Sequence, residues 1–249
     1  MNPEVSVIMP AHNSQDTLQD AVQSVRNQTF SSWELLLVVD AKSSDHTLAL
    51  AQKLARQEDR LRLITGPSGG GCAHNRNAAM QQARARHLAF LDSDDLWHPL
   101  KLQRQLSAMR EQDAALSCTG YGWMDSSGRP RDTVMLPPAR VDFEAMLRRN
   151  WMGCLTVMLD RHQCGNPSFK EALHEDYILW LELTRQHWAL GLRENLATYR
   201  LSKLSRSGDK LKAAKQHWTI LRQHAGQPII KCVFLFAWYS MHSLYSRLR

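Results

Sequence analysis

The sequence lacks the features that define several large classes of protein. Its 249 residues contain neither an internal repeat nor a low-complexity stretch, and 43% hydrophobic with 22% charged residues is the composition of a globular protein. Its uninterrupted apolar runs are shorter than the roughly 20 residues that a membrane-spanning helix needs. We therefore expect a globular chain, not a repeat array, a disordered segment or a membrane-spanning protein.

Cysteine chemistry and export signals are also missing. The five cysteines are scattered and form no C-x-x-C pair, so neither a zinc site nor a dithiol centre is expected. The first apolar run, residues 5–9, is too short and too lightly flanked for the hydrophobic part of a secretory signal. We expect reduced, mostly buried thiols and a cytoplasmic chain.

The sequence has none of the common phosphate-binding or metal-binding motifs. The glycine-rich stretch at residues 66–71 fits neither G-x-G-x-x-G nor G-x-x-x-x-G-K-[ST], and the histidines do not form H-E-x-x-H. We expect this stretch to be a flexible connection. A nucleotidyltransferase would need a glycine-rich, basic loop after the first strand, and Pro10-Ala11-His12-Asn13 does not supply one.

What the sequence does contain is an alternation of apolar runs with amphipathic segments. The runs at residues 5–9, 35–39, 61–64 and 88–91 predict strands, the first ending at Pro10. Helices are expected between them, the first capped by Ser14, the second by Ser44 or Asp45 with Leu48 facing inward, and the third over residues 73–85. This alternation predicts an α/β fold with a mostly parallel central sheet and helices on both faces.

Acidic residues gather where the fourth apolar run ends, at Asp92-Ser93-Asp94-Asp95. Ligands of open α/β sheets bind beyond the carboxyl ends of the strands. Three carboxylates within four residues repel one another unless a cation neutralises them, and oxygen ligands suit Mg²⁺ or Mn²⁺. The alternative is that these acids only cap a helix that starts near Pro99.

The basic residues are concentrated at the other end of the chain. Residues 200–249 contain ten Lys and Arg against one acid, whereas residues 1–199 contain 21 basic and 23 acidic residues. In a helix, an apolar stripe would comprise Ile230, Phe234, Trp238, Met241 and Tyr245. We expect a domain over residues 1–210 and a basic, apolar helical tail over 211–249. The tail would lie on an anionic membrane surface or pack on the domain or a dimer partner.

Several segments, taken in order, form a pattern that extends along most of the chain: residues 5–13, 24–30, 33–35, 76–77, 89–97, 175–181 and 199–200, followed by Ser205 and Ser207. This pattern resembles glycosyltransferase family 2, whose members have the GT-A fold and invert the sugar configuration. Together the segments span roughly residues 4 to 210, far more than one short motif.

The resemblance implies a role for individual residues. It places the nucleotide among Pro10, Ala11, His12, Asn13, Asp40, Arg76, Asp92 and Ser93, and a divalent metal, Mn²⁺ or Mg²⁺, on Asp94. It makes Asp176 the catalytic base, with Glu175 beside it. Without the resemblance, these two acids would be first-turn residues that favour a helix N-terminus.

Two positions depart from the family pattern. Asp40-Ala41-Lys42 stands where the family has two adjacent acids, which weakens the case for uridine, and Ser202 replaces a histidine after Tyr199-Arg200. We expect Arg200, Lys203 and Arg206 to contact the diphosphate instead.

The resemblance implies an inverting, metal-dependent transferase of bacterial glycan biosynthesis. It would move a sugar, from a UDP-sugar in our expectation, to a hydroxyl of a glycan or lipid-linked glycan at the cytoplasmic face of the inner membrane. No nucleic-acid partner is expected, and a homo-oligomer remains open. The alternative is a non-catalytic scaffold that binds lipid or nucleic acid through its basic tail, and the retained clusters of acids favour the enzyme.

Overall fold

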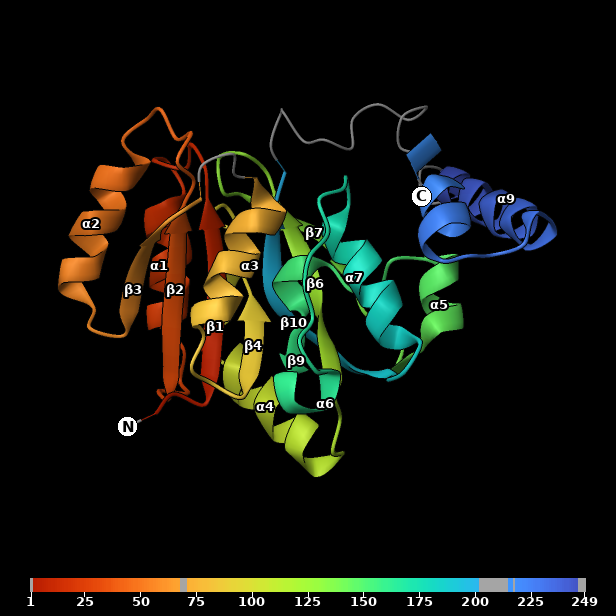
Figure 1. The fold of residues 1–249 in the computed structure, drawn as a ribbon, viewed down its shortest axis with the longest axis horizontal. Helices are drawn as coiled ribbons and strands as arrows, with labels where there is room; N and C mark the ends of the chain where they lie inside the picture. The colour runs from red at the N-terminus through yellow and green to blue at the C-terminus, as the bar shows by residue number, and fades with distance from the viewer. Residues whose placement is uncertain (1, 68–70, 202–214, 217, 246–249) are drawn as a thin grey trace.

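The computed structural model describes residues 2–67, 71–201, 215–216 and 218–245, and is built around one mixed β-sheet (Figure 1). The strand order is β3-β2-β1-β4-β9-β6-β10-β5, with β7 paired to β6 and β8 paired to β10. The strands are β1 (Val5–Ala11), β2 (Trp33–Val39), β3 (Leu61–Thr65), β4 (His87–Phe90), β5 (Leu96–Trp97), β6 (Leu116–Met124), β7 (Pro130–Met135), β8 (Arg140–Val141), β9 (Met158–Asp160) and β10 (Ala189–Arg200).

Helices cover both faces of this sheet, as the sequence predicts. They are α1 (Leu18–Arg26), α2 (Thr47–Gln57), α3 (Cys72–Gln82), α4 (Lys101–Glu111), α5 (Phe143–Arg148), α6 (Arg161–Cys164), α7 (Glu175–Thr184) and α9 (Ile229–Tyr245), with a 3₁₀ turn at η1 (Cys154–Thr156) and a π-helical turn at η2 (Ile220–His224). One hydrophobic cluster joins α1, α2 and α4 to the sheet, and a second joins α3, α5, α7 and α9 to it.

The first half of the sheet is parallel, because β3, β2, β1 and β4 are joined by α2, α3 and α1 crossovers. Every residue of β1 and β2 is buried, which explains why both appear as continuous apolar runs. The second half is mixed. There β9 lies antiparallel between β4 and β6, whereas β6 and β10 are parallel to each other.

The prediction that Pro10 ends the first strand is wrong, because β1 continues to Ala11. The Ile8 carbonyl accepts a hydrogen bond from Leu91 N (3.1 Å) on the β4 side, and Pro10, two residues later, faces that same side. However, β4 ends at Phe90, opposite Ile8, so no strand residue lies beside Pro10 on this side. The missing N–H of the proline therefore costs the sheet no hydrogen bond.

Two helix predictions also need correction. Helix α1 begins at Leu18 with Thr17 as its N-cap, and the hydroxyl of Ser14 instead lies 2.7 Å from that of Ser93. Leu48 does not face the core, since it is 42% exposed, whereas Ala51 and Leu54 of α2 are buried as predicted.

The C-terminal helix α9 lies beside α5 at the far end of the molecule from α2 (Figure 1). Its Cys232 and Leu235 belong to the hydrophobic cluster that also contains α7. The expected boundary between residues 210 and 211 falls outside the described residues, so the division into domain and tail stays a prediction. Among the described helices, none is long and apolar enough to cross a bilayer.

Candidate active site

The sequence-predicted residues of the first half meet at the carboxyl edge of the parallel strands. Because β1 lies between β2 and β4, the residues that follow these three strands are neighbours. His12 Nδ1 lies 3.9 Å from Asp40 Oδ1, and Ser14 joins this loop to Ser93. The structure therefore gathers residues 10–14, Asp40 and the 92–95 acids at one edge.

Asp40, which follows β2, is held by a ring of hydrogen-bond donors. Its Oδ2 accepts from Gly71 N (3.0 Å) and Asn75 Nδ2 (2.8 Å), and its Oδ1 accepts from Lys42 N (2.9 Å). Burial raises the pKa of Asp40, but these hydrogen bonds together outweigh burial and hold the pKa below its usual value. Asp40 is therefore an ionised, fixed acceptor that can receive a donor group of a nucleotide.

Arg76 of α3 joins two parts of the site that are far apart in the sequence. Its Nη1 donates to Glu175 Oε1 (2.8 Å) and its Nη2 donates to Asp92 Oδ1 (2.6 Å). The residue is 3% exposed, and its guanidinium lies 5.2 Å from the centre of the Phe169 ring. Both ends of the guanidinium fork are occupied by carboxylates, so Arg76 connects the acids after β4 with those at the start of α7.

The three acids after β4 do not share one environment. Asp95 is buried, and its Oδ1 accepts from Arg200 N (2.8 Å). Burial, followed by the charges of Asp94 and Asp92, raises the pKa of Asp95. Asp92 and Asp94 are only partly buried. The alternative that these acids cap the next helix is wrong, since α4 has Leu100 as its N-cap and no side-chain cap.

The donor set fits a divalent ion that arrives with a diphosphate better than it fits an ion held by protein alone. Within the described residues, no group of three or more His, Cys, Asp or Glu side chains could hold a metal. Mg²⁺ in substrate sites uses one or two carboxylates and takes its other oxygens from phosphates and water. Asp94, with Asp92 beside it, supplies that number.

Arg200, at the end of β10, packs directly on the acids after β4. Its Nε donates to the carbonyl of Asp94 (2.8 Å), and its Nη2 lies 3.9 Å from Asp20 Oδ2. It is therefore placed at the same edge as Asp94, as a diphosphate contact would require. Lys203 and Arg206, the other two expected contacts, lie outside the described residues.

Glu175 and Asp176 open α7, and the structure gives them different surroundings. Glu175 is buried and bound by Arg76. Asp176 is partly exposed, and Oδ1 accepts from Tyr177 N (2.7 Å). Burial raises the pKa of Asp176 and the Glu175 charge adds to this, which outweighs the opposing charge of Arg76. A carboxyl group with a raised pKa is a stronger proton acceptor once ionised.

Some residues at this edge were not found from the sequence. Asn75 and Gly71 fix Asp40. On β6, the strand next to the one that carries Arg200, the rings of Tyr121 and Trp123 pack at an angle of 55°, with 4.8 Å between their centroids. The alternation Tyr121-x-Trp123 is a signal for one face of a strand. Nothing in the sequence shows that this face lies beside the acids.

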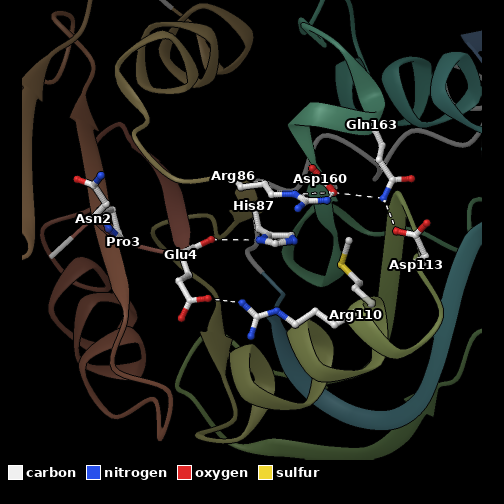
Figure 2. Close-up of a pocket in the computed structure, with 11 residues that line it drawn as sticks. Asn2, Pro3, Glu4, Arg86, His87, Arg110, Asp113, Asp160 and Gln163 are labelled. Carbon is white, nitrogen blue, oxygen red and sulfur yellow. Dashed lines mark hydrogen bonds and ion pairs between the residues drawn. The ribbon is translucent and has the colours of Figure 1, made fainter.

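The structure also contains a cavity of about 550 Å³ at the opposite end of the parallel strands (Figure 2). It lies beside Glu4, which precedes β1, and His87, which begins β4. Four of its charged side chains form ion pairs, Arg86 with Asp160 and Arg110 with Glu4, and Asp113 accepts a hydrogen bond from Gln163 Nε2 (3.3 Å). Internally paired charges leave little for a charged ligand, so this cavity is not the candidate site.

Comparison with known proteins identifies the family of the chain that carries this site. The family model described as "Glycosyl transferase family 2" matches residues 6–165. The chain belongs to this family. The match covers β1 from its second residue, β2 to β4 and the acids at residues 92–95, whereas Glu175, Asp176 and Arg200 lie beyond the matched range.

Relatives match along almost the whole chain. The "Putative teichuronic acid biosynthesis glycosyltransferase TuaG" of Bacillus subtilis is 36% identical over an alignment of 250 positions, which covers 99% of this chain and 98% of that protein. The "UDP-Glc:alpha-D-GlcNAc-diphosphoundecaprenol beta-1,3-glucosyltransferase WfgD" of Escherichia coli is 34% identical over 233 residues, which are 93% and 90% of the two chains.

A solved structure shows the fold. The mannosyltransferase PcManGT of Pyrobaculum calidifontis, in complex with GDP-Man and Mn²⁺, superposes with a TM-score of 0.69 at 17% identity, over 97% of this chain and 70% of that one. The family model and the two relatives confirm the expected family and glycosyl transfer from a nucleotide sugar, and this superposition confirms the GT-A fold. The roles of individual residues remain predictions.

Proposed function

We propose that this family 2 glycosyltransferase binds a UDP-sugar at the carboxyl edge of β1, β2 and β4. The uridine would lie between residues 10–13 and Asp40, because Asp40 is an ionised acceptor fixed by three donors. Asp92 and Ser93 would lie by the ribose. The UDP-glucose donor in the name of the relative WfgD supports the same donor class here.

The diphosphate is proposed to lie between Asp94 and Arg200, with a divalent ion, Mn²⁺ or Mg²⁺, on Asp94. Such an ion would neutralise negative charge that develops on the leaving diphosphate. Arg200 is already fixed at this edge through Asp94 O and Asp95 Oδ1, so it can hold the diphosphate without a large rearrangement. The Mn²⁺ bound to PcManGT is consistent with this proposal.

Asp176 is proposed as the base. It would remove the proton of an acceptor hydroxyl as that oxygen attacks the anomeric carbon from the face opposite the diphosphate, which inverts the configuration. The observation that supports this assignment is the difference in the surroundings of the two acids. The Glu175 carboxylate is hydrogen-bonded to Arg76, whereas Asp176 is partly exposed and has a raised pKa.

The acceptor is proposed to be a growing glycan on a lipid carrier, reached from the cytoplasmic face of the membrane. The diphosphoundecaprenol-linked sugar in the name of WfgD supports this acceptor class. The rings of Tyr121 and Trp123, on the strand beside Arg200, would pack on a sugar ring of this acceptor.

The proposed function can be tested by measuring nucleoside diphosphate release from a panel of UDP-, GDP- and dTDP-sugars in the presence of Mn²⁺ and a diphosphoprenyl-linked sugar. We expect release with a UDP-sugar that depends on both the ion and the acceptor. Release only from GDP- or dTDP-sugars would contradict the uridine assignment, and acceptor-independent release alone would contradict transfer.

A further inference from the structure

Four large apolar side chains at the start of α9 project from the protein. Ile229 is 59% exposed, Ile230 74%, Val233 53% and Phe234 72%. Their spacing of one and four residues places them on one face of the helix. Scattered apolar residues are normal on protein surfaces, but a contiguous group of this kind marks an interaction surface. These four residues are called the α9 patch below.

The opposite face of the same helix is fixed to the protein. Cys232 and Leu235 are buried in the cluster that contains α5 and α7, and Lys231 Nζ donates to Glu144 Oε1 of α5 (2.6 Å). One face of α9 therefore packs on the protein, and the other face is exposed and available to a partner.

The positive charge of the C-terminal part of the sequence favours an anionic partner. From Lys210 to the C-terminus the sequence contains seven Lys and Arg and no acidic residue. Basic residues beside an exposed apolar helix face are the combination that binds anionic lipid head groups and inserts apolar side chains below them.

A second copy of the chain fits the α9 patch less well. A symmetric contact through α9 would bring two strongly basic segments together, and like charges oppose such association. A stable interface also buries about 800 Å² per partner from about 20 to 30 residues, whereas the exposed large apolar residues among the side chains that the structure describes on α9, up to residue 237, number four.

The α9 patch is connected to the proposed catalytic base through packed helices. Tyr177, the residue after Asp176, donates its hydroxyl to the Met146 carbonyl of α5 (2.6 Å), and α5 in turn holds α9 through Glu144. Figure 1 shows α7, α5 and α9 in succession along one end of the molecule. Docking of α9 on a surface thus sets the orientation of α7 relative to that surface.

We propose that the α9 patch docks on an anionic lipid bilayer and, through α5, fixes the orientation of α7 relative to that bilayer. This docking would give Asp176 a fixed position relative to the head groups, where the sugar of a lipid-linked acceptor lies. That last step rests on the proposed function, whereas lipid docking itself does not.

The test is flotation of the full-length protein with phosphatidylcholine vesicles that contain or lack phosphatidylglycerol. The variant is Ile230→Glu with Phe234→Glu. The matched control is Leu48→Glu with Val134→Glu, which makes the same change at two other exposed apolar residues, 42% and 44% exposed, on α2 and β7. Circular dichroism compares the folds, and Ile230→Ser with Phe234→Ser removes the apolar groups without adding charge.

We expect the parent and the control to float with anionic vesicles, and both patch variants to lose at least roughly tenfold in partitioning. Equal partitioning of the serine variant and the parent would overturn the proposal. So would a parent that does not float and forms a dimer that the patch variants dissociate, because the occupant would then be a second copy. Flotation requires no transfer reaction, so failure here would leave the transferase proposal intact.

Discussion

Arg76 donates one nitrogen to Asp92 and another to Glu175, two residues that are 83 positions apart (175 minus 92). One guanidinium, 3% exposed, thus connects the strand end proposed to hold the donor with the helix proposed to carry the base. Replacing only the cation leaves two carboxylates near each other in a partly buried site, which is costly.

Arg76→Met should therefore destabilise the protein by about 3–5 kcal/mol in urea unfolding. The control is Arg104→Met, because Arg104 forms an ion pair with Glu194 in which both side chains are more than half exposed (58% and 51%). It should change the unfolding free energy by less than about 1 kcal/mol. Equal effects of the two substitutions would show that Arg76 is not a structural link.

Substitutions of Asp94 and of Asp95, two of the acids after β4, should affect metal-dependent nucleotide binding differently. Asp94→Ala should abolish the increase in nucleoside diphosphate affinity that Mn²⁺ produces, measured by calorimetry with metal and with chelator, because the ion joins this carboxylate to the phosphates. Asp95→Asn is the control. It keeps an oxygen for Arg200 N and should retain the Mn²⁺ effect. Loss of the effect in Asp95→Asn alone would move the metal contact by one residue.

Much of this arrangement follows from local sequence patterns. The buried runs that form β1, β2 and β4 are continuous because both faces of each strand are covered, and acids follow where β2 and β4 end. A pattern of this kind can place Asp40 and Asp92 at the same edge, because parallel neighbours end together. It therefore predicts the fold of the first half and the nucleotide side of the candidate site.

The remaining features depend on tertiary contacts that no local pattern encodes. The sequence does not show that Arg76 faces Glu175, or that Asp95 turns inward to Arg200 while Asp94 does not. The strand end predicted at Pro10 is wrong because a proline is tolerated there only when β4 has already ended. The two faces of α9 could not be assigned from its apolar stripe alone, since Cys232 is buried and Ile230 is exposed.

The pH dependence of kcat/KM should reflect the raised pKa of Asp176. Burial raises its pKa above the 3.8 of an unperturbed aspartate, so the carboxyl group keeps its proton to a higher pH. The acid limb of kcat/KM should therefore fall at a pH above the ordinary aspartate range, since only the ionised form accepts the acceptor proton. A limb centred at or below 3.8, in a protein that is still folded at that pH, would contradict this.

Asp176 is also the residue on which the account of catalysis depends most. Asp176→Asn keeps the size of the side chain and an oxygen for Tyr177 N, but it cannot accept a proton. A positioned base is worth about 10²- to 10⁴-fold in rate and acts mainly in the transition state. Substrate binding should therefore survive its loss. The matched control is Glu175→Gln, which makes the same chemical change one residue earlier.

The decisive measurement is the single-turnover rate of sugar transfer to a diphosphoprenyl-linked acceptor, with nucleotide affinity measured in parallel. For Asp176→Asn we predict a rate at least roughly a hundredfold below the parent, with UDP affinity within a fewfold. Glu175→Gln should retain more activity and lose stability instead, because its carboxylate is bound to Arg76. If Asp176→Asn transfers sugar at the parental rate, or if Glu175→Gln alone abolishes transfer while remaining folded, Asp176 is not the base.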